Sequence, residues 1–414
     1  MVQNNRSRNQ NHFLPSVDEI EERVLLSATA ILRASAIPAG YDSPTGRNYP
    51  VVPVGASPDV ASFIDPTTNI DNPKRVGIGK SAYVAPFVNI VTGRNQVLIG
   101  EGSDIQDNVF LDARRGSIVI GAQDVVAHGA NIIGPAQMGG DPARPSFIGF
   151  NSILDRATLE PGSYLSAMAR IGPGIVLRTG IKALPGVNIT TQSEADDTTL
   201  GKVVMMSQAD IDFINGVLYV NQNLARGYAD LYYQNPASVR GIGPNPVTDY
   251  NPDSVVPEIN GNSRAIPRFR NRIVGQVAMA NCIAQLRRVM GLGNSVRADE
   301  GFPFRMGRIG RFGNRVTMHA LEESGITTGK NLRVGFRNVI HGGADIPDAD
   351  PSDVTVIADN VHVGNYSVVF RSIVGNNVKI GNKVYLDKCN LADGTVVPDG
   401  TVMINNQVVR KIEW

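Results

Sequence analysis

From Val378 onward, apolar residues recur every six positions along the chain. Two phases, offset from each other by two residues, hold these positions: Val378, Val384, Asn390, Val396 and Val402 in one, and Ile380, Leu386, Ala392, Pro398 and Ile404 in the other. Alternate side chains of a strand share a face, so this pattern predicts short strands, three to a coil, around a triangular core. The segment is predicted to form a hexapeptide-repeat β-helix.

A weaker form of the same period appears in the first half of the chain. One phase there holds Ile118, Asp124, Ala130 and Ala136, and the other holds Ile120, Val126, Ile132 and Met138. The two halves also align with each other, because residues 148–157 (IGFNSILDRA) match residues 363–372 (VGNYSVVFRS) without a gap. Upstream, His128 and His341 coincide if two residues are inserted in the first copy. These matches predict a tandem duplication of one β-helix.

A helix is predicted between the two copies. Ile211, Ile214 and Leu218 have helical spacing, and Ser207 is a suitable N-cap. Residues 235–264 are rich in Pro, Asn, Gly and Ser and are predicted to be a linker. The fold class is therefore mainly β, with two parallel β-helices and one long α-helix after the first. The predicted parts are an N-terminal tail and lead-in segment (1–65), the first β-helix (66–207), the helix and linker (208–265) and the second β-helix (266–414).

The N-terminal part of the chain is polar, except for residues 20–36. This stretch is either a short amphipathic helix or an export-related segment, and Arg33 interrupts its apolar run. We predict a cytoplasmic protein, with export as the alternative. No apolar run reaches the length of a membrane span, so no membrane-spanning helix is expected.

Composition excludes several classes of function. The 39 Lys and Arg residues nearly balance the 38 Asp and Glu residues, which gives no reason to expect nucleic acid or a membrane surface as partner. The only two cysteines, Cys282 and Cys389, form neither a disulfide framework nor a Cys-rich metal site. Any metal must therefore be held by histidines and carboxylates.

The segment from Arg297 to His319 carries the most specific pattern of the chain. It reads RADEGFPFRMGRIGRFGNRVTMH and is followed by Ala-Leu-Glu. An Arg-x-Asp-Glu-Gly start with a histidine 22 residues after the arginine is rare, and it resembles the active-site segment of γ-class carbonic anhydrases. The resemblance implies a zinc enzyme built on a left-handed parallel β-helix. It also implies a trimer in which three histidines from two subunits bind the metal.

In the second copy, the resemblance implies a residue for most of the family's roles. The zinc ligands would be His319 and His341, the interface pair Arg297 and Asp299, and the proton-carrying glutamates Glu300 and Glu322. The third ligand position, five residues after His341, is Ile346, and Gly313 stands where the family has an active-site Gln. Three nearby side chains are candidates to replace the missing imidazole: Asp345, Asp348 and His362.

In the first copy, fewer positions match the family. His128 remains as a candidate metal ligand, but Ile133 replaces its partner and Asp112 stands at the first ligand position. Ile90 and Thr92 stand where the Arg–Asp pair is expected. Two amides match the family's active-site amides: Gln106 and, in the predicted helix, Asn221. A buried histidine in a β-helix is more often structural than a ligand, so His128 is expected to matter little for metal binding.

These residue types suit the chemistry that the resemblance implies. Three neutral imidazoles hold Zn²⁺ and leave a position for water, whose pKa then falls to about 7. The predicted cofactor is zinc, with iron or cobalt as alternatives, and the predicted reaction is reversible hydration of CO2 to bicarbonate. The predicted assembly is a homotrimer in which His319 and His341 come from different chains. With Ile346 at the third ligand position, we expect weak metal binding and low activity.

Two other classes of function remain open from the sequence. A trimeric β-helix that has lost its site can serve as a catalytically inactive scaffold or assembly protein. Hexapeptide acyltransferases share the fold, so the fold alone does not separate them from the anhydrases. The Arg-x-Asp-Glu-Gly segment argues against a transferase, which has no need of it. Metal content and CO2 hydration would separate the first two classes.

Overall fold

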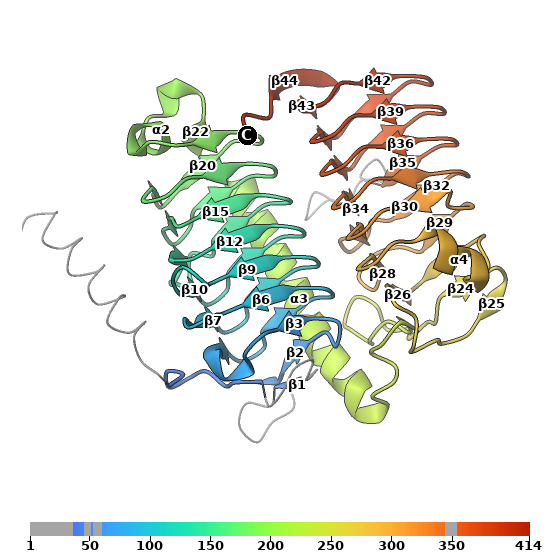
Figure 1. Ribbon diagram of the computed structural model, residues 1–414, viewed down its shortest axis with the longest axis horizontal. Coiled ribbons are helices and arrows are strands. Elements are labelled where there is room, and N and C mark those ends of the chain that lie inside the picture. The colour runs from blue at the N-terminus through green and yellow to red at the C-terminus, as the bar shows by residue number, and fades with distance from the viewer. Residues whose placement is uncertain (1–35, 45–50, 53–59, 344–353) are drawn as a thin grey trace, which may run out of the picture. The chain divides into compact units, whose positions relative to one another are not determined.

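The computed structural model describes residues 36–44, 51–52, 60–343 and 354–414 (Figure 1). The predicted amphipathic or export-related segment, residues 20–36, lies outside the described residues except for Ala36. Within the described residues, two stacks of short parallel strands follow one another along the chain, and a long helix connects them. The predicted fold class is confirmed.

The first β-helix is built from three sheets. Sheet A contains β4 (Val76–Ile78), β7 (Val97–Ile99), β10 (Ile118–Ile120), β13 (Ala136–Met138), β16 (Thr158–Leu159) and β19 (Val176–Leu177). Sheet B contains β1 (Val51–Val52), β2 (Ser62–Ile64), β5 (Tyr83–Val84), β8 (Asp104–Ile105), β11 (Val125–Val126), β14 (Phe147–Ile148), β17 (Tyr164–Leu165), β20 (Ile181–Ala183) and β22 (Val203–Met205). Sheet C contains β3 (Asn69–Ile70), β6 (Asn89–Val91), β9 (Phe110–Asp112), β12 (Asn131–Ile133), β15 (Ile153–Asp155), β18 (Arg170–Ile171) and β21 (Asn188–Ile189).

The second β-helix also has three sheets. Sheet D contains β23 (Ile242–Gly243), β26 (Arg272–Gly275), β28 (Ser295–Ala298), β31 (Thr317–Ala320), β34 (Val339–Gly342), β37 (Val368–Phe370), β40 (Tyr385–Asp387), β43 (Thr401–Ile404) and β44 (Gln407–Lys411). Sheet E contains β24 (Glu258–Ile259), β25 (Asn262–Ser263), β27 (Val277–Met279), β29 (Phe304–Met306), β32 (Ile326–Thr328), β35 (Thr355–Ile357), β38 (Ile373–Val374) and β41 (Asn390–Leu391). Sheet F contains β30 (Arg311–Phe312), β33 (Arg333–Val334), β36 (His362–Val363), β39 (Lys379–Ile380) and β42 (Val396–Val397).

The apolar phases of the sequence become two separate cores, one inside each β-helix. Ile118, Val126 and Ile132 are fully buried in the first core, and Val378 and Leu386 are fully buried in the second. Strands one coil apart pair in register, as Ile118 does with Val97 and Ala136 on its two sides. Full burial of each such side chain stabilises the folded state by about 1.5–3 kcal/mol. The six-residue period therefore reflects the packing of successive coils.

Asparagines occupy many corners of the coils. Asn331, Asn360 and Asn377 all have φ near +60°, a conformation that asparagine tolerates better than most residues. Their side chains form a ladder, because Asn331 Nδ2 donates to Asn360 Oδ1 at 3.1 Å and Asn360 Nδ2 donates to Asn377 Oδ1 at 3.3 Å. These bonds help to keep the coils in register.

Some strands lie outside the segments predicted to form the β-helices. Strands β1 and β2 extend sheet B toward the N-terminus, and β23, β24 and β25 lie within the segment predicted to be a linker. The second β-helix also contains a short helix, α4 (Ile283–Val289), and the first is followed by α2 (Gln192–Asp196). Runs of Pro, Asn and Gly predict a linker well, but they do not exclude two-residue strands that an existing sheet edge completes.

The long helix α3 (Gln208–Gln234) begins at the predicted N-cap, Ser207, whose side chain accepts a hydrogen bond from the Asp210 N–H. It packs on sheet B on the side that faces the second β-helix (Figure 1). The ring of Tyr228 stacks on those of Phe63 and Tyr83, with centroids 5.0 and 6.0 Å away. A further apolar cluster includes residues of α3, sheet B and sheet D and joins the two copies.

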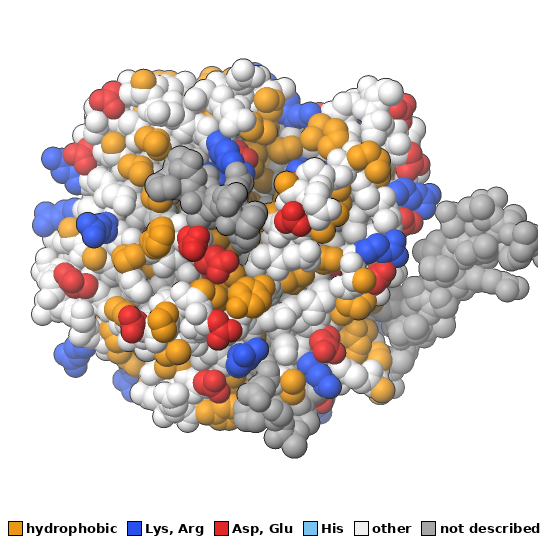
Figure 2. Space-filling view, turned by 180° about the vertical axis from the view of Figure 1, so that it is seen from behind, with side chains coloured by type: hydrophobic (Ala, Val, Ile, Leu, Met, Phe, Trp, Pro, Cys, Tyr) orange, Lys and Arg blue, Asp and Glu red, His pale blue; other side chains and the backbone are white. Residues whose placement is uncertain are grey.

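The surface carries both signs of charge. On the face shown in Figure 2, acidic, basic and hydrophobic side chains are interspersed over the described residues, in keeping with the formal net charge of +1. Among the described helices, none combines the length and apolar character required to cross a membrane.

Candidate metal centre

Two histidines of the second β-helix lie one coil apart on sheet D. His319 on β31 and His341 on β34 are direct register partners. Their neighbours Met318 and Ile340 point into the core of the second β-helix, so the two imidazoles point out of it. Adjacent parallel strands are about 4.8 Å apart, which brings the two rings together, with their centroids 5.2 Å apart.

The third imidazole comes from the first β-helix. His128 follows β11 at a corner of the coil, and its ring centroid lies 5.1 Å from that of His319 and 5.2 Å from that of His341. One candidate ligand nitrogen from each ring lies within 4.8 Å of the other two. His128 Nε2 and His319 Nδ1 are 3.2 Å apart, and two nitrogens on one tetrahedral zinc are separated by about 3.3 Å. The donor set therefore fits a Zn²⁺ ion.

Burial makes two of the three histidines neutral. It lowers the pKa of His128 to about 4 and that of His341 well below its ordinary value. Burial and the Arg297 guanidinium also act to lower the pKa of His319, but the carboxylates of Glu300 and Asp299 outweigh them and raise it to about 9. A metal ligand must be neutral, so His128 and His341 are already in the binding form, and His319 must release a proton when a metal binds.

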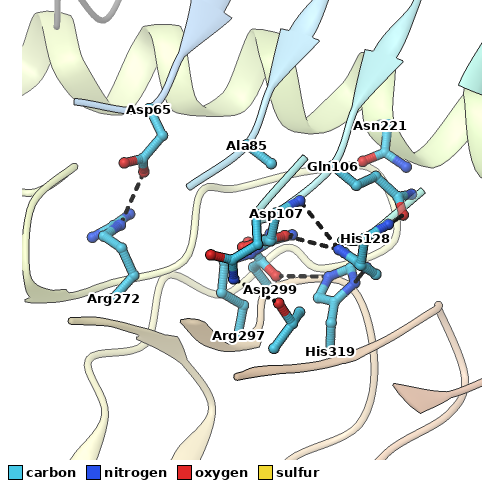
Figure 3. Close-up of polar contacts among 12 residues, drawn as sticks. Asp65, Ala85, Gln106, Asp107, His128, Asn221, Arg272, Arg297, Asp299 and His319 are labelled. Carbon is cyan, nitrogen blue, oxygen red and sulfur yellow. Dashed lines mark hydrogen bonds and ion pairs between the residues drawn. The ribbon is translucent and has the colours of Figure 1, made fainter. Parts of the chain in front are cut away.

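Carboxylates face the outer nitrogens of two of the rings. His319 Nε2 lies 3.1 Å from Glu300 Oε1. It also lies 3.3 Å from Asp299 Oδ1, and His128 Nδ1 lies 3.2 Å from Asp107 Oδ2 (Figure 3). Carboxylates in these positions orient metal-binding imidazoles and increase their basicity. The Nδ1 atom of His341 is buried and has no hydrogen-bond partner among the described residues, which leaves it available to a ligand.

Arg297 connects the two β-helices beneath this cluster. Its Nη2 and Nε donate to the two carboxylate oxygens of Asp107 at 2.7 and 3.2 Å, and its Nη1 donates to Asp299. A second buried pair, Arg272 and Asp65, crosses between the copies at 2.9 Å (Figure 3). Tyr228 of α3 donates a hydrogen bond to Asp299. The Arg297–Asp299 pair predicted from the sequence is present, and Asp107 makes it a triad across the contact between the copies.

Replacing Arg297 with leucine is expected to destabilise the protein by about 3–5 kcal/mol, because the buried carboxylates of Asp107 and Asp299 would lose their shared counter-ion. Chemical denaturation followed by circular dichroism measures this change. Arg311→Leu is the matched control, since Arg311 is exposed on sheet F, and it should change stability by less than about 0.5 kcal/mol. Equal stability of the two variants would contradict the bridging role of Arg297.

The predicted amides lie above His128 in the view of Figure 3. Gln106 Oε1 accepts a hydrogen bond from the backbone N–H of His128 at 3.2 Å. Gln106 Nε2 donates to Asp104 Oδ2 at 2.8 Å. Asn221 on α3 is buried, and its Nδ2 donates to the Val217 carbonyl oxygen. The Asn221 Oδ1 atom has no partner among the described residues. Gln106 therefore contacts the candidate ligand residue His128, whereas Asn221 has a carbonyl oxygen that is available as a hydrogen-bond acceptor.

The two predicted glutamates differ in exposure. Glu300 is buried, and its Oε1 lies 3.1 Å from His319 Nε2. Glu322 is half-buried, and burial followed by the charges of Glu300 and Glu323 raises its pKa. Burial and the charge of Glu300 also raise the pKa of Asp104 well above its ordinary value, although the amide of Gln106 opposes this. No sequence motif pointed to Asp104, an acidic residue at the start of a two-residue strand.

Strand register changes the alignment between the two copies. His341 pairs with His319, and in the first copy Ile133 pairs in the same way with Asp112. The counterpart of His341 is therefore Ile133, and the earlier alignment of His341 with His128 is wrong. His128 lies two residues after β11, and the residue two positions after the matching strand β33 is Phe336.

The same register corrects the Arg position of the first copy. Arg297 pairs with His319, and Val91 pairs with Asp112, so Val91 is the counterpart of Arg297 in place of Ile90. The predicted Asp position moves by one residue as well, from Thr92 to Gly93. The first copy therefore has neither member of the pair, as expected, but at different positions.

The three histidines come from different positions of the two copies, and together they form one group. The first copy supplies one candidate ligand and the second supplies the other two, all within one chain. The expectations that no third imidazole lies beside the pair and that His319 and His341 come from different chains are therefore wrong. Ile346, Asp345 and Asp348 lie outside the described residues, and His362 is exposed on sheet F.

No protein-family model matches the chain. A carbonic anhydrase from Methanosarcina thermophila is 28% identical over 44% of this chain and 81% of its own length. A carboxysome assembly protein, CcmM, from a Nostoc species is 29% identical over 41% of this chain, but only 30% of that protein is covered. A solved hexapeptide transferase family protein from Anaplasma phagocytophilum is 26% identical, covering 41% of this chain and 93% of that one, at a TM-score of 0.31. The homology to these two relatives supports the γ-class carbonic anhydrase family of hexapeptide-repeat proteins, and the repeated sheets are consistent with a tandem duplication.

Proposed function

We propose that the chain is a zinc-dependent carbonic anhydrase whose metal site lies between its own two β-helices. The observation that carries the proposal is the convergence of three buried imidazoles, from His128, His319 and His341, with candidate ligand nitrogens within 4.8 Å of one another. The similarity to the Methanosarcina carbonic anhydrase indicates the reaction. CO2 is the proposed substrate and bicarbonate the product.

When bound, zinc supplies a Lewis acid that makes a nucleophile of water at neutral pH. The chain's own residues hold and orient the site. Asp107 faces His128 and Glu300 faces His319, which fixes the two rings, and Arg297 fixes Asp107 in turn. The ring of Phe150 stacks on that of His128, with centroids 5.7 Å apart, and excludes water from that side.

The glutamates provide a direction for proton release. Glu300 lies beside His319 in the buried interior, and Glu322 lies nearer the surface, where the charge of Glu300 contributes to raising its pKa. A proton accepted by Glu300 can pass to Glu322 and from there to solvent. Such transfer by a positioned carboxylate typically contributes about 10²–10⁴-fold to rate.

Elemental analysis of the purified protein, combined with stopped-flow CO2 hydration, tests the proposal. We expect one zinc per chain, loss of hydration on treatment with a chelator, and recovery when zinc is added back. One zinc per chain without hydration would instead favour an assembly role, as in the Nostoc relative. If the purified protein contains no metal and does not hydrate CO2, the scaffold and acyltransferase alternatives remain.

The contact between the copies also supports a larger assembly. The first copy contributes a corner of its coil, which carries His128, and the second contributes sheet D, so the two surfaces in contact are different. The counterpart surfaces are sheet C, which carries Asp112 and Ile133, and the corner with Phe336, whose side chain is 43% exposed. Contacts between unlike surfaces generate a closed ring when the rotation between neighbouring units closes. We propose an assembly with threefold or pseudo-threefold symmetry in which other chains cover these two surfaces.

Sedimentation is expected to give a mass well above the 44.3 kDa of one chain, and Phe336→Glu should shift the protein toward the monomer. The reason is that a charge at the centre of an apolar contact remains without a partner after burial. The variant should keep its zinc, because Phe336 is not part of the histidine cluster. Val408→Glu, at an exposed apolar residue of the terminal strand β44, is the control and should leave the mass unchanged. A wild-type monomer at micromolar concentration would contradict the proposed assembly.

A further inference from the structure

A cleft lies between the two β-helices, apart from the histidine cluster. Its volume is about 330 Å³, and its walls include Asn131 and Asn151 from the first copy and Arg337, Tyr366, Lys383 and Trp414 from the second. That size lies within the range of small-molecule sites, which are typically about 300–1,000 Å³. Gly129, next to His128 in the sequence, is also part of the wall.

The charge of the cleft is positive. Arg337 Nη2 donates to Asn131 Oδ1 at 2.9 Å and to the Gly129 carbonyl oxygen at 3.3 Å, but no carboxylate pairs with Arg337 in the part of the chain that is described. Burial and the nearby Arg315 guanidinium lower the pKa of Arg337, yet a guanidinium stays protonated at neutral pH. Lys383 adds a second cation, whose Nζ donates a hydrogen bond to the main-chain oxygen of Trp414 at 2.8 Å, and no Asp or Glu side chain lines the cleft. A half-buried, charged guanidinium whose hydrogen-bond partners are neutral acceptors favours an anionic ligand.

Two aromatic rings give the cleft flat walls. The Arg337 guanidinium lies over the Tyr366 ring, 5.2 Å from its centroid, and the Lys383 ammonium lies 4.6 Å from the centroid of the Trp414 ring. Trp414 is fixed in place, because its Nε1 donates to the Met168 carbonyl oxygen at 2.6 Å. Aromatic faces beside cations suit a ligand that is planar as well as negatively charged.

We propose that this cleft binds a small planar organic carboxylate. Arg337 would pair with the carboxylate through its planar fork, and Tyr366 and Trp414 would hold the flat body of the ligand. The cleft is larger than an inorganic anion requires, since a water molecule occupies only about 30 Å³. The Oδ1 atom of Asn151 is buried without a partner in the described chain and offers an acceptor for a donor group on the ligand. The inference does not depend on the proposed metal or reaction.

Tryptophan fluorescence tests the proposal directly, because Trp414 is the only tryptophan of the protein. Benzoate is the probe, benzamide is its neutral counterpart of the same shape, and acetate carries the charge without the ring. We expect a saturable change with benzoate at one site per chain, with binding at least tenfold tighter than that of benzamide or acetate. Titration in the presence of a metal chelator should give the same affinity, since the three histidines do not line the cleft.

Two substitutions locate the site. Arg337→Gln is expected to weaken benzoate binding at least tenfold, whereas Arg311→Gln, at an exposed arginine of the same copy outside the cleft, should leave it unchanged. Lys383→Gln is a second variant that leaves the Arg337 contacts between the copies in place, and it should weaken binding severalfold. Equal binding of benzamide and benzoate, no saturable change with benzoate, or wild-type affinity in both the Arg337 and Lys383 variants would each overturn the proposal.

Discussion

Replacing His128 with alanine is expected to remove zinc from the chain as completely as replacing His319 or His341. Each imidazole is one of three that converge, and a zinc site with only two protein ligands is weak. Zinc sites total about 10–16 kcal/mol over all their ligands, so the loss of one should cost roughly 3–5 kcal/mol, or at least about a hundredfold in affinity. Elemental analysis after dialysis measures the metal that remains.

The duplication supplies matched controls for this experiment. Asp112 is the counterpart of His319 in the first copy, and Phe336 is the counterpart of His128 in the second. Asp112→Asn and Phe336→Ala should therefore leave one zinc per chain. If His128→Ala keeps its zinc, the metal is held elsewhere, and the next candidate is the group formed by Asp299, Glu300 and His319. That result would reject the site between the copies.

The fold could be predicted from the sequence because its signal is local and repeated. Core residues such as Ile120, Val126 and Leu386 recur with the period of the coil, and each repeat gives the same information again. The strands of the predicted linker could not be predicted in the same way. Ile242 and Ile259 are single buried apolar residues among polar ones, and their two-residue strands exist only because neighbouring coils offer free edges.

The three histidines could be chosen from the sequence, but their arrangement could not. The alignment matched His128 with His341 because both precede a glycine, whereas strand register places His341 opposite Ile133. Which face of one β-helix meets which face of the other is a property of tertiary packing, and no local pattern encodes it. Asp107 was missed for the same reason, because a corner aspartate that pairs with Arg297 looks like a solvent-exposed turn residue in the sequence.

Register also gives a simpler account of the positions that lack histidine. The alignment made from the sequence placed isoleucine at the same ligand position in both copies, as Ile133 and Ile346, which favoured a site that had lost its metal ligands. Among the described residues, the group of three histidines includes none of the counterpart positions Asp112, Ile133 and Phe336. His128, His319 and His341 are the positions that meet. If these three imidazoles hold the proposed zinc, the site needs no histidine at Asp112, Ile133 or Phe336.

Replacing Glu322 with glutamine is expected to lower the turnover of CO2 hydration by about 10²-fold while the zinc content stays at one per chain. Glu322 is half-buried and close enough to Glu300 for the charge of Glu300 to raise its pKa, so it can relay a proton between the buried carboxylate and solvent. Glutamine has nearly the same shape but cannot carry the proton. The loss should therefore appear in kcat at low buffer concentration, with little change in kcat/KM.

Glu323→Gln is the control for this prediction, because Glu323 is the exposed neighbour of Glu322 and lies outside the proposed route. Its turnover should match that of the wild type. A high concentration of imidazole buffer should restore turnover in Glu322→Gln, since a small buffer molecule can accept the proton in place of the missing carboxylate. A purely structural role of Glu322 would not respond to buffer. Turnover that stays low in imidazole, or an equal loss in both variants, would therefore exclude Glu322 as the route by which protons leave the site.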